Sequence, residues 1–338
     1  MMFSFNPHDL DDLTDDALTD RVRILQRRNG HRYSVDDVAT AWVALRAMTT
    51  GSTSSLGGVA GPQGAAVRSC LDLGCGIGSV LLMLADRLPS SVRAVGIEAQ
   101  AASYALAERN IERNRLGRRV GVQFGDLRDR ALLDRALQAE AAFGRETGFD
   151  LVTGTPPYKP LGTASLSPDP QRAHARVELR GGVEAYLNAA ARVLEPNGVF
   201  VMCAQSELAP RVAAGAAAVQ LVEIYKLDVI PRLARKTRLF AVHVFVRDGA
   251  ADGGAAVSAR LRAGGASVSV HDAAPHGRPA TVTMTRERLV LRDEAGERTP
   301  ESRAMRAYFG MFDEPVTKTT GRRDESGITA VIESDSAS

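Results

Sequence analysis

The chain is poor in cysteine, lysine and aromatic residues. Its cysteines are odd in number and show no CxxC spacing, which argues against both a disulfide framework and a zinc site; they are Cys70, Cys75 and Cys203. Aromatic residues make up 5% of the chain, which gives little support for binding single strands mainly by stacking. The basic residues are nearly all arginine, and we attribute this bias to genome composition.

Long apolar runs and an export signal are also lacking. No apolar run approaches the ~20 residues that a membrane-spanning helix needs. The start of the chain is acidic and has no basic segment followed by an apolar one; its carboxylates are Asp9, Asp11, Asp12, Asp15 and Asp16. Together with the few cysteines, this predicts a protein of the reducing cytoplasm with no membrane association.

Hydrophobic residues and balanced charge characterise what is present. The 338 residues are 44% hydrophobic, enough for one large domain with appendages. Lysine and arginine total 42 against 40 carboxylates, a formal net charge of +2. Such a balance does not indicate a nucleic-acid partner by itself, so local basic clusters must decide that question.

Apolar runs alternate with amphipathic segments from Val67 onward, a pattern typical of a doubly wound α/β sheet. The expected strands span residues 68–73, 92–97, 120–124, 149–153, 197–204, 221–230 and 240–247. The expected helices span residues 79–87, 101–114, 131–142 and 182–193, and an earlier helix spans residues 37–48.

The N-terminal segment is expected to begin as a polar arm with a short helix over residues 1–20. Asn29-Gly30 favours a type I′ turn, so Arg21–Arg28 and His31–Val35 are expected to pair as a hairpin. After residue 248, two short strands at 281–284 and 289–292 and a helix beginning near Pro300 are expected.

These patterns divide the chain into five parts. They are an N-terminal arm, hairpin and helix (1–49), a Gly/Ser-rich flexible linker (50–66), the α/β domain (67–248), a C-terminal extension with short strands and a helix (249–312) and a disordered polar tail (313–338).

A glycine-rich turn follows the first strand of the α/β domain. Its glycines are Gly74, Gly76 and Gly78, between a predicted strand and a predicted helix, which is the context that a nucleotide-binding turn requires. Glu98 ends the next predicted strand, about 20 residues downstream, where a carboxylate can accept hydrogen bonds from both ribose hydroxyls. A purely structural glycine turn is the alternative.

Two cofactor classes use such a turn. A dinucleotide requires GxGxxG, whereas here the third glycine comes one residue early and Ser79 takes its place. Asp72 stands just before the turn, where it could meet a cationic amino-acid group. The motif resembles that of S-adenosylmethionine-dependent methyltransferases, and Phe124-Gly125-Asp126 matches the position where that family contacts adenine.

This resemblance implies a cofactor, a set of cofactor-binding residues and a fold. The cofactor is S-adenosylmethionine, with S-adenosylhomocysteine as the product, bound by Asp72, Gly74, Gly76, Gly78, Glu98 and Asp126. The fold is a Rossmann-like class I methyltransferase, with a seven-stranded, mostly parallel sheet, its last strand antiparallel, and helices on both faces.

Thr155-Pro156-Pro157-Tyr158 follows the apolar run Phe149–Val152. Two adjacent prolines fix φ twice and remove two backbone donors, which leaves nearby carbonyls without ladder partners. A stiff edge with spare acceptors beside an aromatic ring suits a planar group that carries an NH2. The alternative is a rigid strand-to-loop turn.

The same four residues resemble the (Asn/Asp/Ser)-Pro-Pro-(Tyr/Phe) motif of amino-methyltransferases that act on adenine N6, cytosine N4 or glutamine N5. The resemblance implies catalytic roles without a metal. The Thr155 side chain and the Pro156 carbonyl would accept the amine hydrogens, Tyr158 would stack on the substrate, and Pro157 would contact it. Thr155 departs from the family pattern, which weakens the inference to adenine N6; the alternative is an ordinary β-branched strand end.

Three further stretches resemble the subgroup of tRNA(Val) adenine-N6 methyltransferases: Gly30–Asp37, Ala175–Glu178 and Gly182–Glu184. In that subgroup the N-terminal hairpin lies near the pocket, which implies that Arg32, Tyr33 and Asp36 do so here. Arg176 would lie in a loop over the pocket. The alternatives are a capped helix and solvated charges on a loop.

A basic segment, Pro231–Arg238, joins the last two predicted strands at the same end of the sheet. Its Arg235, Lys236 and Arg238 could flank the pocket and bind phosphates, although a charged loop without a ligand is the alternative. The leading hypothesis is therefore methyl transfer to an exocyclic amino nitrogen, adenine N6 in tRNA or other structured RNA. Methylation of a protein glutamine amide or a small molecule, and a non-catalytic S-adenosylmethionine-binding RNA partner, are the alternatives.

Overall fold

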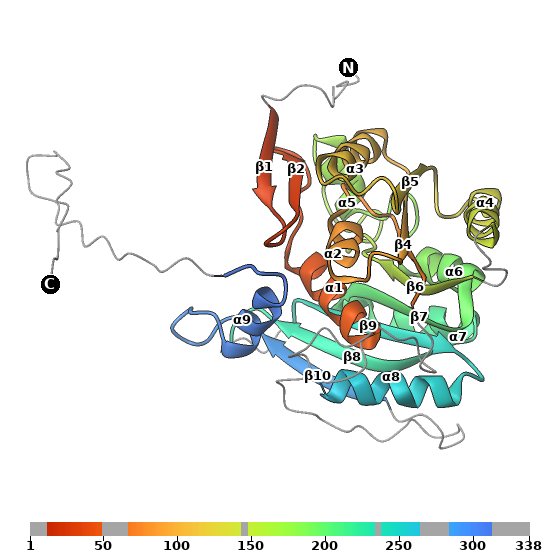
Figure 1. Cartoon of the computed structure of the whole chain (residues 1–338). Coiled ribbons are helices and arrows are strands. Elements are labelled where there is room, and N and C mark those ends of the chain that lie inside the picture. The colour runs from red at the N-terminus through yellow and green to blue at the C-terminus, as the bar shows by residue number, and fades with distance from the viewer. Residues whose placement is uncertain (1–11, 49–66, 143–147, 234–237, 264–283, 313–338) are drawn as a thin grey trace, which may run out of the picture.

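The computed structural model describes residues 12–48, 67–142, 148–233, 238–263 and 284–312. In this part of the chain an eight-stranded sheet has the order β10-β8-β9-β7-β6-β3-β4-β5 (Figure 1). Neighbouring strands are parallel except that β9 is antiparallel to both β7 and β8. The strands are β3 (Ser69–Leu73), β4 (Arg93–Glu98), β5 (Val120–Phe124), β6 (Phe149–Gly154), β7 (Leu194–Gln205), β8 (Leu221–Ile230), β9 (Phe240–Arg247) and β10 (Thr285–Val290).

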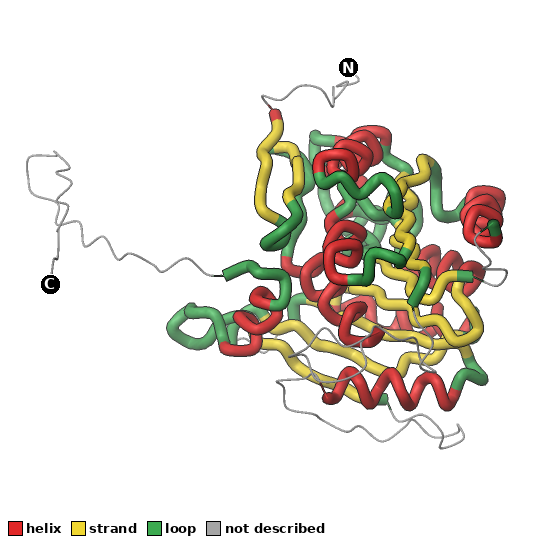
Figure 2. The backbone as a smooth tube through the Cα atoms, viewed as in Figure 1, coloured by secondary structure: helices red, strands yellow, loops and turns green. Residues whose placement is uncertain are grey.

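Helices cover both faces of this sheet (Figures 1 and 2). One hydrophobic core joins the sheet to α1 (Val35–Met48), α2 (Ser79–Arg87), α3 (Ala101–Arg113) and α8 (Ala251–Ala263). The second core joins the opposite face to α4 (Arg130–Ala141), α6 (Val183–Val193) and α7 (Ala209–Ala218), which follows the short 3-10 helix η2 (Ser206–Leu208). Every residue of β3 is buried, because a central parallel strand is covered on both faces.

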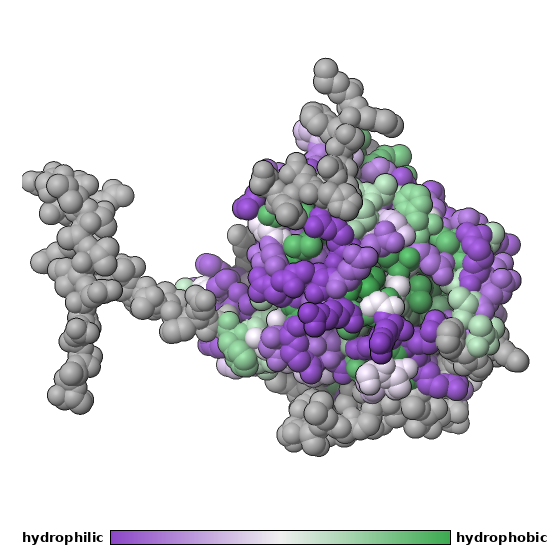
Figure 3. Space-filling model, turned by 45° about the horizontal axis from the view of Figure 1, so that its top comes forward, coloured by the Kyte–Doolittle hydropathy of each residue, from purple (hydrophilic) through white to green (hydrophobic). Residues whose placement is uncertain are grey.

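Hydrophilic side chains dominate the face shown in Figure 3.

The expected fold class is confirmed, and the expected strands and helices of the α/β domain are all present. The strands at 120–124, 221–230 and 240–247 and the helix at 79–87 have the expected bounds. The other elements differ from expectation by at most three residues; β7, for example, begins at Leu194. The sheet has one strand more than the expected seven, because β10 adds to its edge beside β8.

The N-terminal hairpin differs from the expectation. β1 (Leu13–Ala17) pairs antiparallel with β2 (Arg23–Arg27), so a strand replaces the short helix expected within residues 1–20. Asn29-Gly30 is not the hairpin turn, and the chain leads from there into α1. Instead, Gly30 packs against the side chain of Gln171, so closely that a Cβ at this position would collide with it. This tertiary contact overrides the local preference of Asn-Gly for a hairpin turn.

The C-terminal extension belongs to the same core as the α/β domain. α8, which the sequence did not predict, packs its Val257 and Leu261 into the first core. β10 covers Thr285–Val290 and overlaps the expected strand 289–292 at its last two residues, whereas residues 281–283 of the other expected strand lie outside the described residues. The expected helix is α9 (Pro300–Ala307). The proposed linker and tail lie outside the described residues. None of the described helices is long and apolar enough to cross a membrane.

Candidate active site

Neighbouring strand ends bring the predicted site residues together. The glycine-rich turn follows β3, Glu98 ends β4, Asp126 lies just after β5, and Thr155 lies just after β6. These four strands are parallel and adjacent, in the order β6-β3-β4-β5. Their carboxyl ends therefore meet at one edge of the sheet, the usual place of a ligand site in such folds.

The glycine-rich turn needs glycine for two different reasons. Gly74 and Gly76 have φ values of 61° and 58°, a region that side-chain-bearing residues rarely adopt. A Cβ at Gly74 would collide with the Tyr186 hydroxyl, so this glycine allows close packing within the protein. A Cβ at Gly76 would meet nothing within 4 Å, so the backbone there borders open space that a ligand can fill. Gly78, with φ 88°, precedes α2.

Glu98 braces this turn and lines the space in front of it. Its carboxylate accepts hydrogen bonds from the Gly76 amide at 2.9 Å and the Gln100 amide at 2.6 Å. Burial raises the pKa of Glu98, while these amides oppose the shift. A carboxylate has about four lone-pair sites, so both oxygens retain capacity for further donors such as ribose hydroxyls.

Asp72 lies beneath this space and does not line it. Its side chain is buried, and the Thr153 hydroxyl donates a hydrogen bond to it at 2.8 Å. Burial raises the pKa of Asp72 to about 7. The structure therefore places Asp72 as a support under the glycine-rich turn, not at the surface where a ligand's cationic group would meet it.

Asp37, in the first turn of α1, lines the space instead. It accepts a hydrogen bond from the Ser34 amide at 2.9 Å, which is one half of a capping box. Burial, followed by the nearby Asp36 charge, raises the pKa of Asp37. The sequence reasoning assigned Asp37 no separate role, although the Ser-x-x-Asp spacing was a usable signal for the start of this helix.

Asp126 closes the far side of the same space, with Gly125 and Leu127. The Arg128 guanidinium donates to both carboxylate oxygens, at 2.9 Å and 2.7 Å. Burial alone would raise the pKa of Asp126, but the hydrogen bonds from Arg128 lower it overall. We call the space lined by Gly76, Glu98, Asp126 and Asp37 the cofactor hollow. Its carboxylate acceptors suit a nucleoside with a cationic side chain, as S-adenosylmethionine is.

A second hollow, of about 940 Å³, adjoins the cofactor hollow, and we call it the acceptor hollow. Thr155, Pro156 and Tyr158 line it, while Pro157 lines the cofactor hollow. Thr155 lines both hollows. The predicted motif therefore stands where the two spaces meet.

The Tyr158 side chain is held in place from three sides. Its hydroxyl donates to a carboxylate oxygen of Asp36 at 2.7 Å and lies 3.2 Å from the Cys203 sulfur. Its ring stacks on Phe240, with centroids 6.4 Å apart and an interplanar angle of 23°. Burial raises the pKa of Tyr158 well above its usual range, so the phenol stays neutral. Cys203 and Phe240 carried no local sequence signal, because β7 and β9 bring them here.

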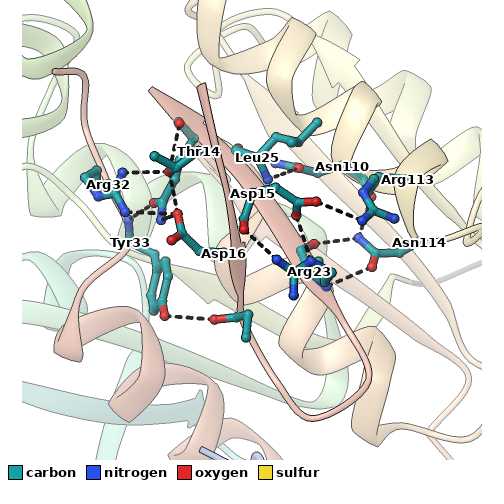
Figure 4. A network of polar contacts seen from close by, with 12 residues as sticks. Thr14, Asp15, Asp16, Arg23, Leu25, Arg32, Tyr33, Asn110, Arg113 and Asn114 are labelled. Carbon is teal, nitrogen blue, oxygen red and sulfur yellow. Dashed lines mark hydrogen bonds and ion pairs between the residues drawn. The ribbon is translucent and has the colours of Figure 1, made fainter. Parts of the chain in front are cut away.

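Cationic side chains line the acceptor hollow. The predicted Arg32 and Arg176 are among them, together with Lys159 and Arg172. Arg176 ends helix α5 (Pro170–Arg176), within the segment expected to be a loop. Tyr33 lines both hollows, and its hydroxyl donates to the Ala17 carbonyl at 3.1 Å (Figure 4).

Of the other predicted phosphate contacts, the structure describes Arg238. Arg238 forms an ion pair with the buried Asp228 at 3.2 Å and lines neither hollow. Arg235 and Lys236 lie outside the described residues. A phosphate contact by Arg238 therefore stays a prediction.

The hairpin is fixed against the rest of the site by polar contacts that Figure 4 shows. Asn110 of α3 accepts a hydrogen bond from the Leu25 amide at 2.6 Å, and Asn114, which follows α3, accepts one from the Arg23 amide at 2.9 Å. On the other strand, Asp15 pairs with Arg113 of α3 at 2.8 Å. The hairpin is therefore fixed against α3 and the residue that follows it.

The segment after α5 is also tied down. Arg211 of α7 contacts both carboxylate oxygens of Glu178, each at 3.0 Å, and pairs with Glu184 of α6 at 2.6 Å. Three residues close to Glu178 in the chain line the cofactor hollow: His174, Arg180 and Gly181. His174 lacks the sequence spacing of a catalytic triad or a metal site, and Arg211 lies in no recognisable motif.

The chain matches a family model described as "Methyltransferase domain" over residues 68–237. Among curated proteins, it is 32% identical over 169 residues to "tRNA1(Val) (adenine(37)-N6)-methyltransferase" of Porphyromonas gingivalis, covering 49% of this chain and 60% of that protein. Proteins with the same name from Escherichia coli and Bacteroides fragilis are 32% and 35% identical, covering 52% and 48% of this chain and 64% and 62% of their own lengths. The chain spans about three fifths of the length of these relatives.

Proposed function

The chain belongs to the methyltransferase domain family and is an S-adenosylmethionine-dependent methyltransferase, and on this premise we propose that its acceptor is the N6 amino group of an adenine in tRNA or another structured RNA. The observation that carries the proposal is the position of Thr155, which lines both hollows. A group held in the acceptor hollow at Thr155 borders directly on the cofactor hollow.

The residues of the cofactor hollow fit S-adenosylmethionine. Glu98 would accept hydrogen bonds from the ribose hydroxyls, Asp126 would face the adenine, and Asp37 would face the cationic amino-acid end. The backbone of Gly76 would border the ligand, since no protein atom fills the space where a Cβ would be. When bound, this cofactor supplies a methyl group activated by a sulfonium.

The acceptor side suits an amino nitrogen attached to a planar ring. The Thr155 hydroxyl and the Pro156 carbonyl would accept hydrogen bonds from the two N–H groups of the amine. The nitrogen lone pair would then point toward the cofactor hollow. The fixed ring of Tyr158 would stack on the base. Positive charge that develops on the nitrogen during attack would be stabilised by these acceptors, and the nitrogen then releases one proton to solvent.

Two observations support RNA as the substrate class. The acceptor hollow is lined by four basic side chains, Arg32, Lys159, Arg172 and Arg176, against the two carboxylates Asp36 and Asp37. Such an excess of positive charge favours a phosphate-bearing substrate. The names of the relatives also point to an RNA substrate, since each names a tRNA adenine as the methylated group.

The proposal is tested by incubating the full chain with S-adenosylmethionine carrying a tritiated methyl group and with separate pools of tRNA, DNA, protein and small molecules. We expect label in tRNA, recovered as N6-methyladenosine after nuclease digestion and chromatography. Thr155→Val tests the role of the hydroxyl, because it removes this group and keeps the shape of the side chain. Methyl transfer should fall in this variant, while S-adenosylmethionine should still bind. Label in glutamine amides or small molecules, or binding of cofactor and RNA without transfer, would each overturn the proposal.

A further inference from the structure

A third hollow lies beside the acceptor hollow, between the N-terminal hairpin, the start of α1 and the C-terminal helix α9. Its volume is about 340 Å³. The residues that line it are Asp16, Gln26, Arg32, Tyr33, Ser34, Val35, Val38, Arg298, Met305 and Arg306. Neither the proposed cofactor nor the methylated base uses this space.

Three arginines from separate segments face this hollow. Arg32 precedes α1, Arg298 lies between β10 and α9, and Arg306 lies on α9. Asp16 is the one carboxylate among the lining residues, and it is already engaged with Arg32 at 3.0 Å (Figure 4). The lining is therefore cationic overall, and arginine presents a planar fork of donors that matches phosphate oxygens.

The hollow is continuous with the proposed active site through shared residues. Tyr33 lines the cofactor hollow, the acceptor hollow and this third hollow. Arg32 and Ser34 line both the acceptor hollow and the third hollow. A chain that enters the acceptor hollow at Thr155 therefore has a cationic space within reach of its neighbouring units.

α9 is held firmly where it contributes to this hollow. Met305 is buried in the first core, and the Asp20 amide donates to the Phe309 carbonyl at 2.9 Å. Arg87 of α2 donates to the Tyr308 carbonyl at 3.0 Å and pairs with Asp20 at 2.7 Å. Arg306 is thus carried by a fixed helix, which reduces the entropy lost when a ligand binds to it.

We propose that this hollow is a subsite for a backbone phosphate of the RNA, next to the nucleotide that is methylated, with Arg298 and Arg306 as its phosphate contacts. The inference rests on the proposed function and assigns the C-terminal extension a role in holding the substrate.

The test uses the full chain and four proteins: wild type, Arg306→Ala, Arg306→Lys and Arg303→Ala. Arg303 is the matched control, because it is an exposed arginine of the same helix that does not line the hollow. tRNA binding is measured by fluorescence anisotropy at several salt concentrations, S-adenosylmethionine binding by calorimetry, and KM and kcat by methyl transfer.

We expect Arg306→Ala to weaken tRNA binding by about tenfold, as for one lost charge-assisted contact. The slope of log Kd against log salt should fall by about one, as for the loss of one phosphate contact. KM for tRNA should change more than kcat, and S-adenosylmethionine affinity should not change. Arg306→Lys should recover part of the loss, and Arg303→Ala should match wild type.

Two results would overturn the subsite while leaving the proposed function standing. One is methyl transfer to tRNA by wild type with equal effects of Arg306→Ala and Arg303→Ala. The other is a loss of tRNA affinity in Arg306→Ala with an unchanged salt slope and weakened cofactor binding, which would indicate a structural role. Transfer to a protein substrate and not to RNA by wild type would overturn the proposed function, and this subsite with it.

Discussion

The Tyr158 hydroxyl donates a hydrogen bond of 2.7 Å to Asp36, and this contact joins the proline-rich turn after β6 to the first turn of α1. The two residues are 122 positions apart in the chain. Their contact orients an aromatic ring at the acceptor hollow, and it does so with a carboxylate from the N-terminal segment. The N-terminal helix is therefore part of the proposed acceptor site.

Tyr158→Phe should lower kcat/KM for methyl transfer by about tenfold, because the ring loses a hydrogen bond to a charged partner worth about 1.5 kcal/mol. S-adenosylmethionine affinity, measured by calorimetry, should stay at the wild-type value. Tyr104→Phe is the control, since it removes a hydroxyl that contacts Glu108 at 2.6 Å on an exposed surface away from the hollows. Equal rates for Tyr158→Phe and wild type would show that the tether does not orient the ring.

Glu98→Gln should raise the dissociation constant for S-adenosylmethionine by about tenfold, because a charged acceptor for the ribose hydroxyls is replaced by a neutral amide. The variant keeps the shape of the side chain, but its one oxygen can accept from only one of the Gly76 and Gln100 amides, which contact different carboxylate oxygens of Glu98. Glu112→Gln, an exposed change on α3, should leave the constant unaltered. Titration calorimetry measures both, and unchanged affinity in Glu98→Gln would argue against the ribose contact.

Asp72 should make the unliganded protein less stable as the pH rises from 4 to 8. Its folded pKa of about 7 lies above the ordinary value of 3.8, because burial disfavours the charged carboxylate. The folded state therefore holds a proton that the unfolded state has lost, and stability falls as pH rises through this window, by up to about 4 kcal/mol for a three-unit shift. This contribution is fully present below pH 4.

Asp72→Asn cannot titrate and should lack this contribution. Urea denaturation of both proteins at pH 5 and pH 8 measures it, as the change with pH in the difference between their free energies of unfolding. Taking the difference between the free energies of unfolding of the two proteins removes the opposite contributions of carboxylates such as Asp126. A difference that does not change with pH would contradict the prediction.

Arg46→Met should destabilise the fold by about 3 kcal/mol, because Arg46 of α1 lies 3.6 Å from Glu287 of β10 and both side chains are buried. The guanidinium also lies 4.5 Å from the centre of the Trp42 ring. Arg46→Met with Glu287→Leu should recover a large part of this loss, since no buried carboxylate then faces an apolar group. Urea denaturation of the single and double variants measures the coupling; strictly additive losses would show that the pair does not interact.

The sequence predicted the α/β domain closely because its signals are local. The alternation of buried strands with amphipathic helices places β8 and β9 at their observed bounds, and the glycines after β3 adopt the left-handed conformations that the turn requires. The proline-rich motif likewise lies where the strand order puts it, at the end of β6. In these segments each residue's preference agrees with the fold.

Segments whose pairing depends on distant residues were not predicted. Asn29-Gly30 favours a hairpin turn locally, yet the strand paired with β2 is β1, and the loop at Gly30 packs against Gln171. Arg238 belongs to a basic run in the sequence, but a buried carboxylate on β8 takes up its charge. Asp72 precedes the glycine-rich turn, but the fold buries it under Thr153.

The sequence by itself determined the class of fold, the cofactor motif and the motif at Thr155, because glycine, proline and hydrophobic periodicity act through the backbone within a few residues. The tertiary structure alone decided which side chains surround those motifs. Asp36 reaches Tyr158, Asp37 and not Asp72 lines the cofactor hollow, and α9 brings Arg306 beside the hairpin. Such placements arise from packing between elements distant in the chain, which local preferences do not specify.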